Sequence, residues 1–222
     1  MTGLYTPRHG VFTVANSDRG KAANRRLIPT PNTTVLTRKL PTMAQVLKGA
    51  GYRTAIAGKW HLSDDPIPYG FDTNFGGLKW GAPKSYFSPY RNPKLKDGPK
   101  GEHLPARLAT DLCHWIRNAQ EKNEHFFVYF PFYSVHTPIQ ARADLTARYT
   151  GKSGTHHRNA KYAAMVEAMD LAVGQILDLL DELNCHPGIG SRIKIHRKFL
   201  LAIGRDKETV TLAPDPDAVL PQ

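Results

Sequence analysis

The sequence lacks the features that would place it at once in several broad classes of protein. It has no apolar run of the roughly 20 residues that a membrane-spanning helix needs, so no membrane partner is expected. Its first residues, Met1–Arg8, lack the basic-then-apolar order of a secretion signal and indicate no cellular location. It contains only two cysteines, Cys113 and Cys185, which excludes a disulfide framework and leaves the redox compartment undecided.

Acidic residues are also few compared with basic ones. The 222 residues include 19 Asp and Glu against 30 Lys and Arg, and the resulting formal charge of +11 favours anionic partners. The basic residues gather in three clusters, each of which by itself is typical of a solvated face: Arg19–Arg26, Lys94–Lys100 and Arg192–Lys198. No RNA-recognition or helix-turn-helix pattern accompanies them, so nucleic acid is not an expected partner.

The most informative stretch is Gly51–Leu62, which reads Gly-Tyr-Arg-Thr-Ala-Ile-Ala-Gly-Lys-Trp-His-Leu. A helical pattern starts at Leu40–Thr42 and is predicted to end at Gly51. The small, β-branched and apolar residues Thr54–Ala57 then suit a short buried strand. Gly58 lets the backbone turn there or come close to a ligand.

Lys59 and His61 follow this predicted strand, two positions apart. If the backbone is still extended, both side chains lie on the same face at the carboxyl end of the strand, where open α/β sheets bind ligands. A permanent cation beside a titratable imidazole suits an anionic ester whose leaving oxygen needs a proton. Taken alone, Lys-x-His is more typical of a surface lysine and a half-buried structural histidine than of a ligand site.

A second strand is predicted from the apolar run Phe126–Tyr133, which is typical of a strand buried on both faces of a parallel sheet. His136 and Pro138 come directly after it. A lone histidine after a strand is often structural, but this one falls at a second strand end, which is again where ligands bind.

These segments together resemble the sulfatase family of the alkaline-phosphatase-like superfamily. The string G-Y-x-T-x-x-x-G-K-W-H closely resembles the family's second signature, and His136-Thr-Pro138 resembles its H-x-P element. Pro66–Asp72 resembles the P-x-x-x-G-F-D element, for which a structural role is expected. Met1–Val14 resembles the segment that follows the family's nucleophile motif, C-x-P-S-R or C-x-A-S-R, and its Arg8-His9 pair is expected to fix a turn.

Two amphipathic helices are predicted to cover the sheet, over Leu104–Lys122 and Lys161–Asn184. Cys113-His-Trp-Ile-Arg imitates the spacing of the nucleophile motif, but it lies in mid-helix, and we expect Cys113 to be a small buried residue. Gly174 is expected to mark a close approach of the second helix to the sheet. That helix carries an apolar stripe predicted to pack in the core: Tyr162, Met165, Val166, Met169, Val173, Ile176, Leu177 and Leu180.

The expected fold is therefore α/β, a partial alkaline-phosphatase-like domain with a mostly parallel sheet flanked by helices. The resemblance covers residues 1–184, and residues 185–222 are expected to form an irregular, loosely ordered basic tail. Residues 74–101, rich in Gly, Pro, Tyr and Lys, are expected to be an insertion near the mouth of the site that sets substrate choice. A truncated gene or a change of reading frame near Asn184 would explain the tail.

The resemblance also implies a chemistry. Lys59 would bind sulfate and the formylglycine oxygen, His61 would hydrogen-bond the formylglycine hydroxyl and help eliminate sulfate, and His136 would contact sulfate and protonate the leaving alcohol. The substrate would be an aryl or glycan sulfate ester. Calcium is expected for the family, but the sequence has no Asp-Asn pair and Asp64-Asp65 is not a substitute, so its ligands are not found in this chain. The formylglycine nucleophile would precede Met1, and no sulfatase turnover is expected of the chain as written.

Two other functions stay open at this point. One is a non-catalytic module that holds sulfated glycans or other anions through Lys59, His61, His136 and the net charge. The other is a phosphatase or phosphotransferase of the same superfamily, which would need two metal ions with Asp and His ligands. No such set of ligands is found, so this function ranks last. The oligomeric state cannot be inferred from the sequence.

Overall fold

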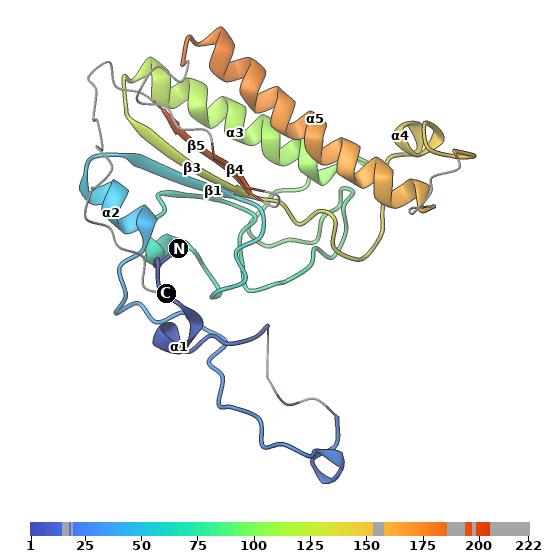
Figure 1. Ribbon diagram of the computed structural model, residues 1–222. Helices are drawn as coiled ribbons and strands as arrows, with labels where there is room; N and C mark the ends of the chain where they lie inside the picture. Colours follow the sequence, from blue (N-terminus) through green and yellow to red (C-terminus); the bar gives the residue numbers. More distant parts are fainter. Residues whose placement is uncertain (15–17, 19, 153–157, 186–193, 197–198, 205–222) are drawn as a thin grey trace, which may run out of the picture.

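A sheet with the strand order β2-β1-β3-β5-β4 lies at the centre of the protein (Figure 1). The computed structural model describes residues 1–14, 18, 20–152, 158–185, 194–196 and 199–204. Strand β1 (Arg53–Ala57) pairs in parallel with β2 (Thr73–Phe75) on one side and with β3 (Phe126–Pro131) on the other. Helices flank these three parallel strands, so the predicted α/β class is confirmed.

Part of the segment that we expected to be irregular forms strands in the described residues 194–196 and 199–204. Strand β5 (Phe199–Gly204) pairs antiparallel with β3, and β4 (Lys194–His196) pairs antiparallel with β5. The expectation relied on composition, and composition does not show whether a segment has a partner strand that is distant in sequence. The rest of 186–222 lies outside the described residues, and the boundary at residue 184 stays a prediction.

Strands β1 and β3 are buried on both faces, as their apolar sequences predicted. Thr54–Ala57 are all buried, and β3 contains five buried residues and one half-buried one. Alternate side chains enter two cores, because successive residues of a strand point to opposite faces. Ala55 and Val128 contribute to one core, and Ile56 and Phe127 contribute to the other.

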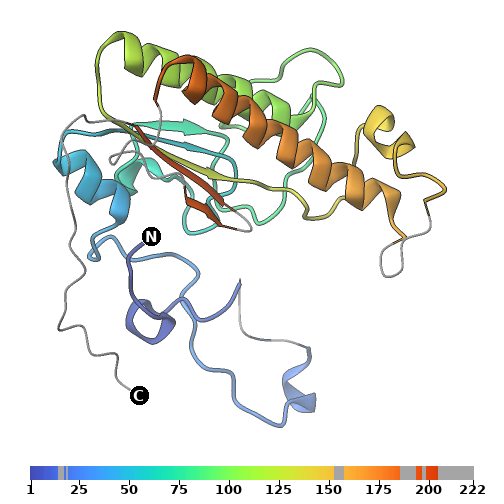
Figure 2. The same cartoon turned by 45° about the horizontal axis from the view of Figure 1, so that its top comes forward.

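The two long helices cover one face of the sheet (Figures 1 and 2). Helix α3 (Leu104–Glu121) and helix α5 (Ala160–Glu182) pack on each other and on the first core. Cys113 is 8% exposed inside α3, which confirms its prediction as a buried residue. The short helix α4 (Ala143–Ala147) packs on α5 through Leu145.

The packing of α5 corrects two predictions. Tyr162 and Val166 are 43% and 40% exposed, so the predicted apolar stripe was partly misplaced. Small residues of the helix that the prediction passed over instead lie in the buried face: Ala164, Ala168 and Ala172. A Cβ atom added to Gly174 would have no atom of the described residues beyond its own helix within 4 Å, so the expected close approach to the sheet was wrong.

The opposite face of the sheet is covered by α2 (Met43–Gly49) and the segment around the turn η2 (Ile67–Tyr69). Thr42 caps α2 through a reciprocal pair of hydrogen bonds with Gln45, a strong start signal that follows from the Thr-x-x-Gln spacing. Phe71 is fully buried, and Asp72 accepts hydrogen bonds from the Thr54 backbone N and hydroxyl, both at 2.9 Å. The structural role predicted for Pro66–Asp72 is therefore confirmed.

The amino-terminal segment lies on the same side as α2, away from α3 and α5 (Figure 2). It contains α1 (Thr6–His9) and the single turn η1 (Ala22–Asn24). Helix α1 ends at Gly10, whose φ of 75° is left-handed, and the Nδ1 atom of His9 accepts a hydrogen bond from Val11 N at 3.2 Å. Arg8 and His9 are thus the last two residues of a single helical turn, and the predicted role of the pair in fixing it stays a prediction.

Gly58 shows how closely the strand ends approach each other. A Cβ atom on Gly58 would lie 2.2 Å from the carbonyl oxygen of Pro131, and its φ of 103° is unfavourable for any other residue. We expect Gly58→Ala to lower the free energy of unfolding by about 2 to 4 kcal/mol, because backbone cannot move aside cheaply. Urea denaturation of the purified chain measures this.

Gly174→Ala is the matched control for that experiment. Its Cβ would enter open space in the middle of a helix, and the same substitution should there stabilise the protein by about 0.5 to 1 kcal/mol. Equal effects of the two substitutions would contradict the close contact between Gly58 and β3.

Candidate functional site

Lys59 leaves the sheet from between the ends of two strands. The backbone N of Gly58 donates to Phe75 O at 2.9 Å, and the backbone N of Lys59 donates to Pro131 O at 2.7 Å. The chain after β1 is therefore held to both neighbouring strands at their carboxyl ends. The Lys59 side chain is half-buried at this edge.

His61 reaches the same edge, but not by the extended backbone that we considered. Gly58 and His61 both have left-handed φ angles, 103° and 62°, so the strand ends at Ala57 and the alternation of faces does not continue. The position of His61 depends instead on its neighbour Trp60, which is 4% exposed and donates from its indole nitrogen to the Ser63 hydroxyl at 2.7 Å. Trp60 also packs against Tyr69, with 5.2 Å between ring centroids.

His136 comes to the site from the end of β3. Its backbone N donates to Tyr133 O at 3.0 Å, and its carbonyl oxygen accepts from the Tyr86 hydroxyl at 3.0 Å. Its side chain is exposed, with Nδ1 at 3.0 Å from the carbonyl oxygen of Thr137. Two contacts thus fix the backbone, while the imidazole stays open to solvent.

Lys59 and His136 leave from the ends of the neighbouring strands β1 and β3, and both influence the imidazole of His61. Burial lowers the pKa of His61 below its ordinary value, and the positive charges of Lys59 and His136 lower it further. Such charge effects weaken with distance, which agrees with the places of Lys59 and His136 at the ends of adjacent strands. His61 is neutral at pH 7 in this setting and can accept a proton or a hydrogen bond.

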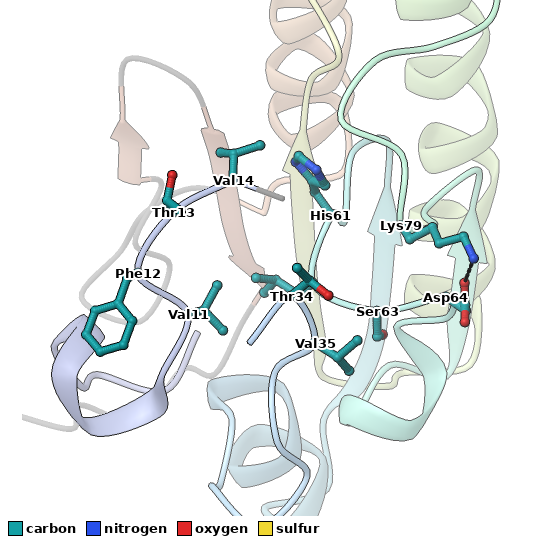
Figure 3. A pocket seen from close by; sticks show the side chains of 11 residues that line it. Val11, Phe12, Thr13, Val14, Thr34, Val35, His61, Ser63, Asp64 and Lys79 are labelled. Atoms are coloured by element: carbon teal, nitrogen blue, oxygen red, sulfur yellow. Dashed lines mark ion pairs between the residues drawn. The ribbon is translucent and has the colours of Figure 1, made fainter. Parts of the chain in front are cut away.

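A cavity of about 650 Å³ opens beside His61 (Figure 3). Its walls come from three separate parts of the chain: residues 11–14, residues 34–35 and residues 61–64, together with Lys79. Asn32 holds the first of these walls in place, because its Oδ1 atom accepts hydrogen bonds from Phe12 N at 2.6 Å and Thr13 N at 3.2 Å. The volume lies within the range of pockets that bind small molecules.

Residues 74–101 were expected to form an insertion near the mouth of the site. They also contribute residues to the core and to the cavity beside His61. Tyr86 and Tyr90 are 0% and 1% exposed and belong to the core under α3 and α5. Lys79 lines the cavity, and Gly81 lies against the imidazole of His61. Sequence reasoning missed both residues, because a lysine and a glycine in a loop carry no signal of what they face.

The two adjacent acidic residues near the site each form an ion pair with a lysine. Asp64 pairs with Lys79 at 2.8 Å, and Asp65 pairs with Lys94 at 2.6 Å. Within the described residues, no group of three or more His, Cys, Asp or Glu side chains is arranged to hold a metal ion. Cys113 is also no candidate nucleophile, because burial raises the pKa of its thiol.

Fold and site together define an α/β protein whose basic side chains gather at the carboxyl edge of a parallel sheet. Over residues 1–187, the chain matches the family described as Sulfatase. The chain belongs to the sulfatase family. Among the helices that the structure describes, none is long and apolar enough to cross a membrane.

Two curated relatives illustrate the match. A protein named sulfatase from Formosa agariphila is 29% identical in an alignment 237 residues long, and the match covers 83% of this chain and 42% of that protein. The N-acetylgalactosamine-6-sulfatase of Sus scrofa is 30% identical over 212 residues, covering 82% of this chain and 36% of that enzyme. The chain thus spans well under half the length of these relatives.

Solved structures agree on the fold. One reported for glycosaminoglycan metabolism by Bacteroides thetaiotaomicron aligns with a TM-score of 0.62 at 18% identity, over 82% of this chain and 44% of that one. Ps i-CgsB in complex with k-i-k-neocarrahexaose aligns with a TM-score of 0.58 at 20% identity, over 81% of this chain and 51% of that one.

The electrostatic coupling predicts a specific pH behaviour. Lys59→Gln removes a neighbouring positive charge, so the pKa of His61 should rise, whereas Lys122→Gln, at the far end of α3, should leave it unchanged. NMR titration of the His61 ring protons measures both. An unchanged titration in Lys59→Gln would show that the two side chains do not face each other.

The lowered pKa of His61 also determines how the stability of the fold changes with pH. Because the pKa of His61 is lower in the folded than in the unfolded chain, its contribution to stability is complete above the unfolded value of about 6.5. That contribution is lost as the pH falls below this value toward the folded pKa, since the unfolded chain then binds more protons.

Proposed function

We propose that this chain carries the sulfate-binding part of a sulfatase site, which serves the hydrolysis of sulfate monoesters to an alcohol and sulfate. The observation that supports the proposal is that Lys59 and His136 follow the ends of two adjacent parallel strands, β1 and β3, and the lowered pKa of His61 agrees with it. Three basic groups around one space are suited to a sulfo group, whose oxygens are negatively charged throughout the transfer.

Each residue has a role that fits its chemistry. Lys59 supplies a point charge for a sulfo oxygen. His61, neutral at pH 7, accepts a hydrogen bond or a proton from the hydroxyl that attacks sulfur. The exposed imidazole of His136 delivers a proton to the alcohol oxygen as its bond to sulfur breaks. In the family, a formylglycine hydrate supplies the attacking oxygen.

The substrate class is part of the proposal. Relatives named N-acetylgalactosamine-6-sulfatase and a structural neighbour in complex with k-i-k-neocarrahexaose favour a glycan sulfate over an aryl sulfate. The cavity beside His61 is large enough for one sugar ring with its substituents.

The family's calcium does not fit the acidic residues near the site. Asp64 and Asp65 each form an ion pair with a lysine, and Asp65 also accepts a hydrogen bond from Ile67 N at 3.0 Å. We propose that calcium, if the active protein binds it, takes neither carboxylate as a ligand. No step of the proposed chemistry is therefore assigned to it.

The chain as printed should bind sulfate esters without hydrolysing them, because it has no Cys-x-Pro-Ser-Arg or Cys-x-Ala-Ser-Arg motif. Calorimetry with N-acetylgalactosamine 6-sulfate should show affinity that falls about tenfold or more in Lys59→Ala, the loss of one charged hydrogen bond. Lys122→Ala, an exposed lysine near the opposite edge of the sheet, is the control of equal charge.

Release of sulfate by this chain would contradict the prediction that it does not hydrolyse sulfate esters. If release were seen and were abolished by Cys113→Ala, the buried thiol would be the nucleophile after all. Equal affinities of the wild-type and Lys59→Ala proteins for the sulfate ester would contradict the prediction that Lys59 binds it.

A non-catalytic glycan-binding module is the second candidate, favoured by the formal charge of +11. It predicts salt-sensitive retention on a heparin column that is lost in Lys59→Ala. The sulfatase proposal predicts instead that retention follows the exposed basic clusters: it should persist in Lys59→Ala and shift to lower salt when Arg25 and Arg26 are both changed to Ala.

A further inference from the structure

The segment Gly76–Gly81 is tied to the ends of both strands that carry the site. The carbonyl oxygen of Gly76 accepts a hydrogen bond from the buried Tyr133 hydroxyl at 3.0 Å, three residues before His136. The carbonyl oxygen of Leu78 accepts from the backbone N of His61 at 3.0 Å. Lys79 pairs with Asp64 at 2.8 Å. This segment therefore has a fixed position relative to β1 and β3.

Gly81, at the end of this segment, lies directly against the imidazole of His61. A Cβ atom on Gly81 would be 2.6 Å from Cε1, 3.1 Å from Nε2 and 3.2 Å from Nδ1 of the ring. Cε1 is the ring carbon between the two nitrogens that exchange protons. The backbone of Gly81 therefore covers this part of the imidazole. Real side chains do not approach this closely, and only glycine is compatible with the present ring position.

We propose that Gly81 is a positioning residue, whose missing side chain allows the imidazole of His61 to lie where it faces Lys59 and His136. The inference rests on the proposed function, since it assigns the positioning of His61 to sulfate binding. A glycine of the Gly76–Gly81 segment thereby determines the position of the His61 side chain, which follows β1.

The contact at Gly81 differs from an ordinary packing constraint. The atoms that an added Cβ would meet belong to the end of a side chain with two rotatable bonds, whereas at Gly58 they belong to the backbone of Pro131. The φ of Gly81 is not left-handed, so alanine suits its backbone. Gly81→Ala should thus turn the ring of His61 aside while the fold remains intact.

The charges around His61 determine how this displacement is detected. Lys59 and His136 act on the ring from the two strand ends, and Lys79 on the loop is paired with Asp64. A ring that turns away from Gly81 becomes more exposed to water, and its pKa should rise toward the ordinary value. Sulfate affinity should fall about tenfold as one hydrogen bond is lost.

The test compares Gly81→Ala with Gly174→Ala in the full chain. Three quantities are measured: the melting temperature, the NMR titration of His61, and calorimetric affinity for inorganic sulfate. In Gly81→Ala we expect a melting temperature within about 2 °C of wild type, a raised pKa of His61 and about tenfold weaker sulfate binding. Gly174→Ala should change neither titration nor affinity.

A double-mutant cycle shows whether Gly81 acts through His61. In the His61→Ala background, Gly81→Ala should have no further effect on sulfate affinity. An effect as large as in the wild-type background would overturn the inference, as would an unchanged His61 titration in folded Gly81→Ala. A fall in stability as large as that of Gly58→Ala would also overturn it, because Gly81 would then be a packing residue.

The two proposals fail in different ways. If wild-type protein does not bind sulfate, the proposed function fails, while the His61 titration still reports whether Gly81 positions the ring. If sulfate binds but Gly81→Ala leaves both readouts unchanged, only the positioning role fails.

Discussion

The parallel pairing of β1 and β3 is the constraint on which the site depends. With Ala55 opposite Val128, the two strands run in the same direction and end at the same edge of the sheet. Lys59 and His136 leave from that edge, and the hydrogen bond from Lys59 N to Pro131 O holds the strand ends together. A shift of one residue in this register would turn every side chain of β1 to the other face, and would separate the basic groups that the site needs.

The same arrangement explains why the site is suited to anions. A charged imidazole at the half-buried position of His61 is unfavourable beside other positive charges, and the lowered pKa of His61 relieves part of that repulsion. A bound sulfo group would supply opposite charge and favour the protonated imidazole again. Binding of the anion and protonation of His61 are therefore coupled, which is useful where a proton has to move during bond breaking.

Much of the fold could be predicted from the sequence, because it follows from local patterns. The apolar run of β3, the Thr42–Gln45 capping pair of α2 and the amphipathic period of α3 each give a signal within a few residues. Lys59, His61 and His136 were predicted as site residues from strand ends and motif resemblance, and their roles stay a prediction. The reason given for placing Lys59 and His61 together was wrong, since a left-handed His61 next to a buried Trp60 does not show in the sequence. The strands of the tail and the open space at Gly174 depend on distant partners and were also missed.

Residues 74–101 both border the cavity and support the fold. Tyr86 and Tyr90 are buried in the core, and Tyr86 also holds the backbone of His136 in place. Substitutions at these two positions would alter stability and site geometry together. Lys84 is exposed, and its ammonium group lies 5.1 Å from the ring centroid of the half-buried Trp80, close to the loop's contact with His61 but outside the core. Side chains at Trp80 and Lys84 can therefore change without disturbing the buried packing of Tyr86 and Tyr90, so this part of the loop is freer to vary than the rest.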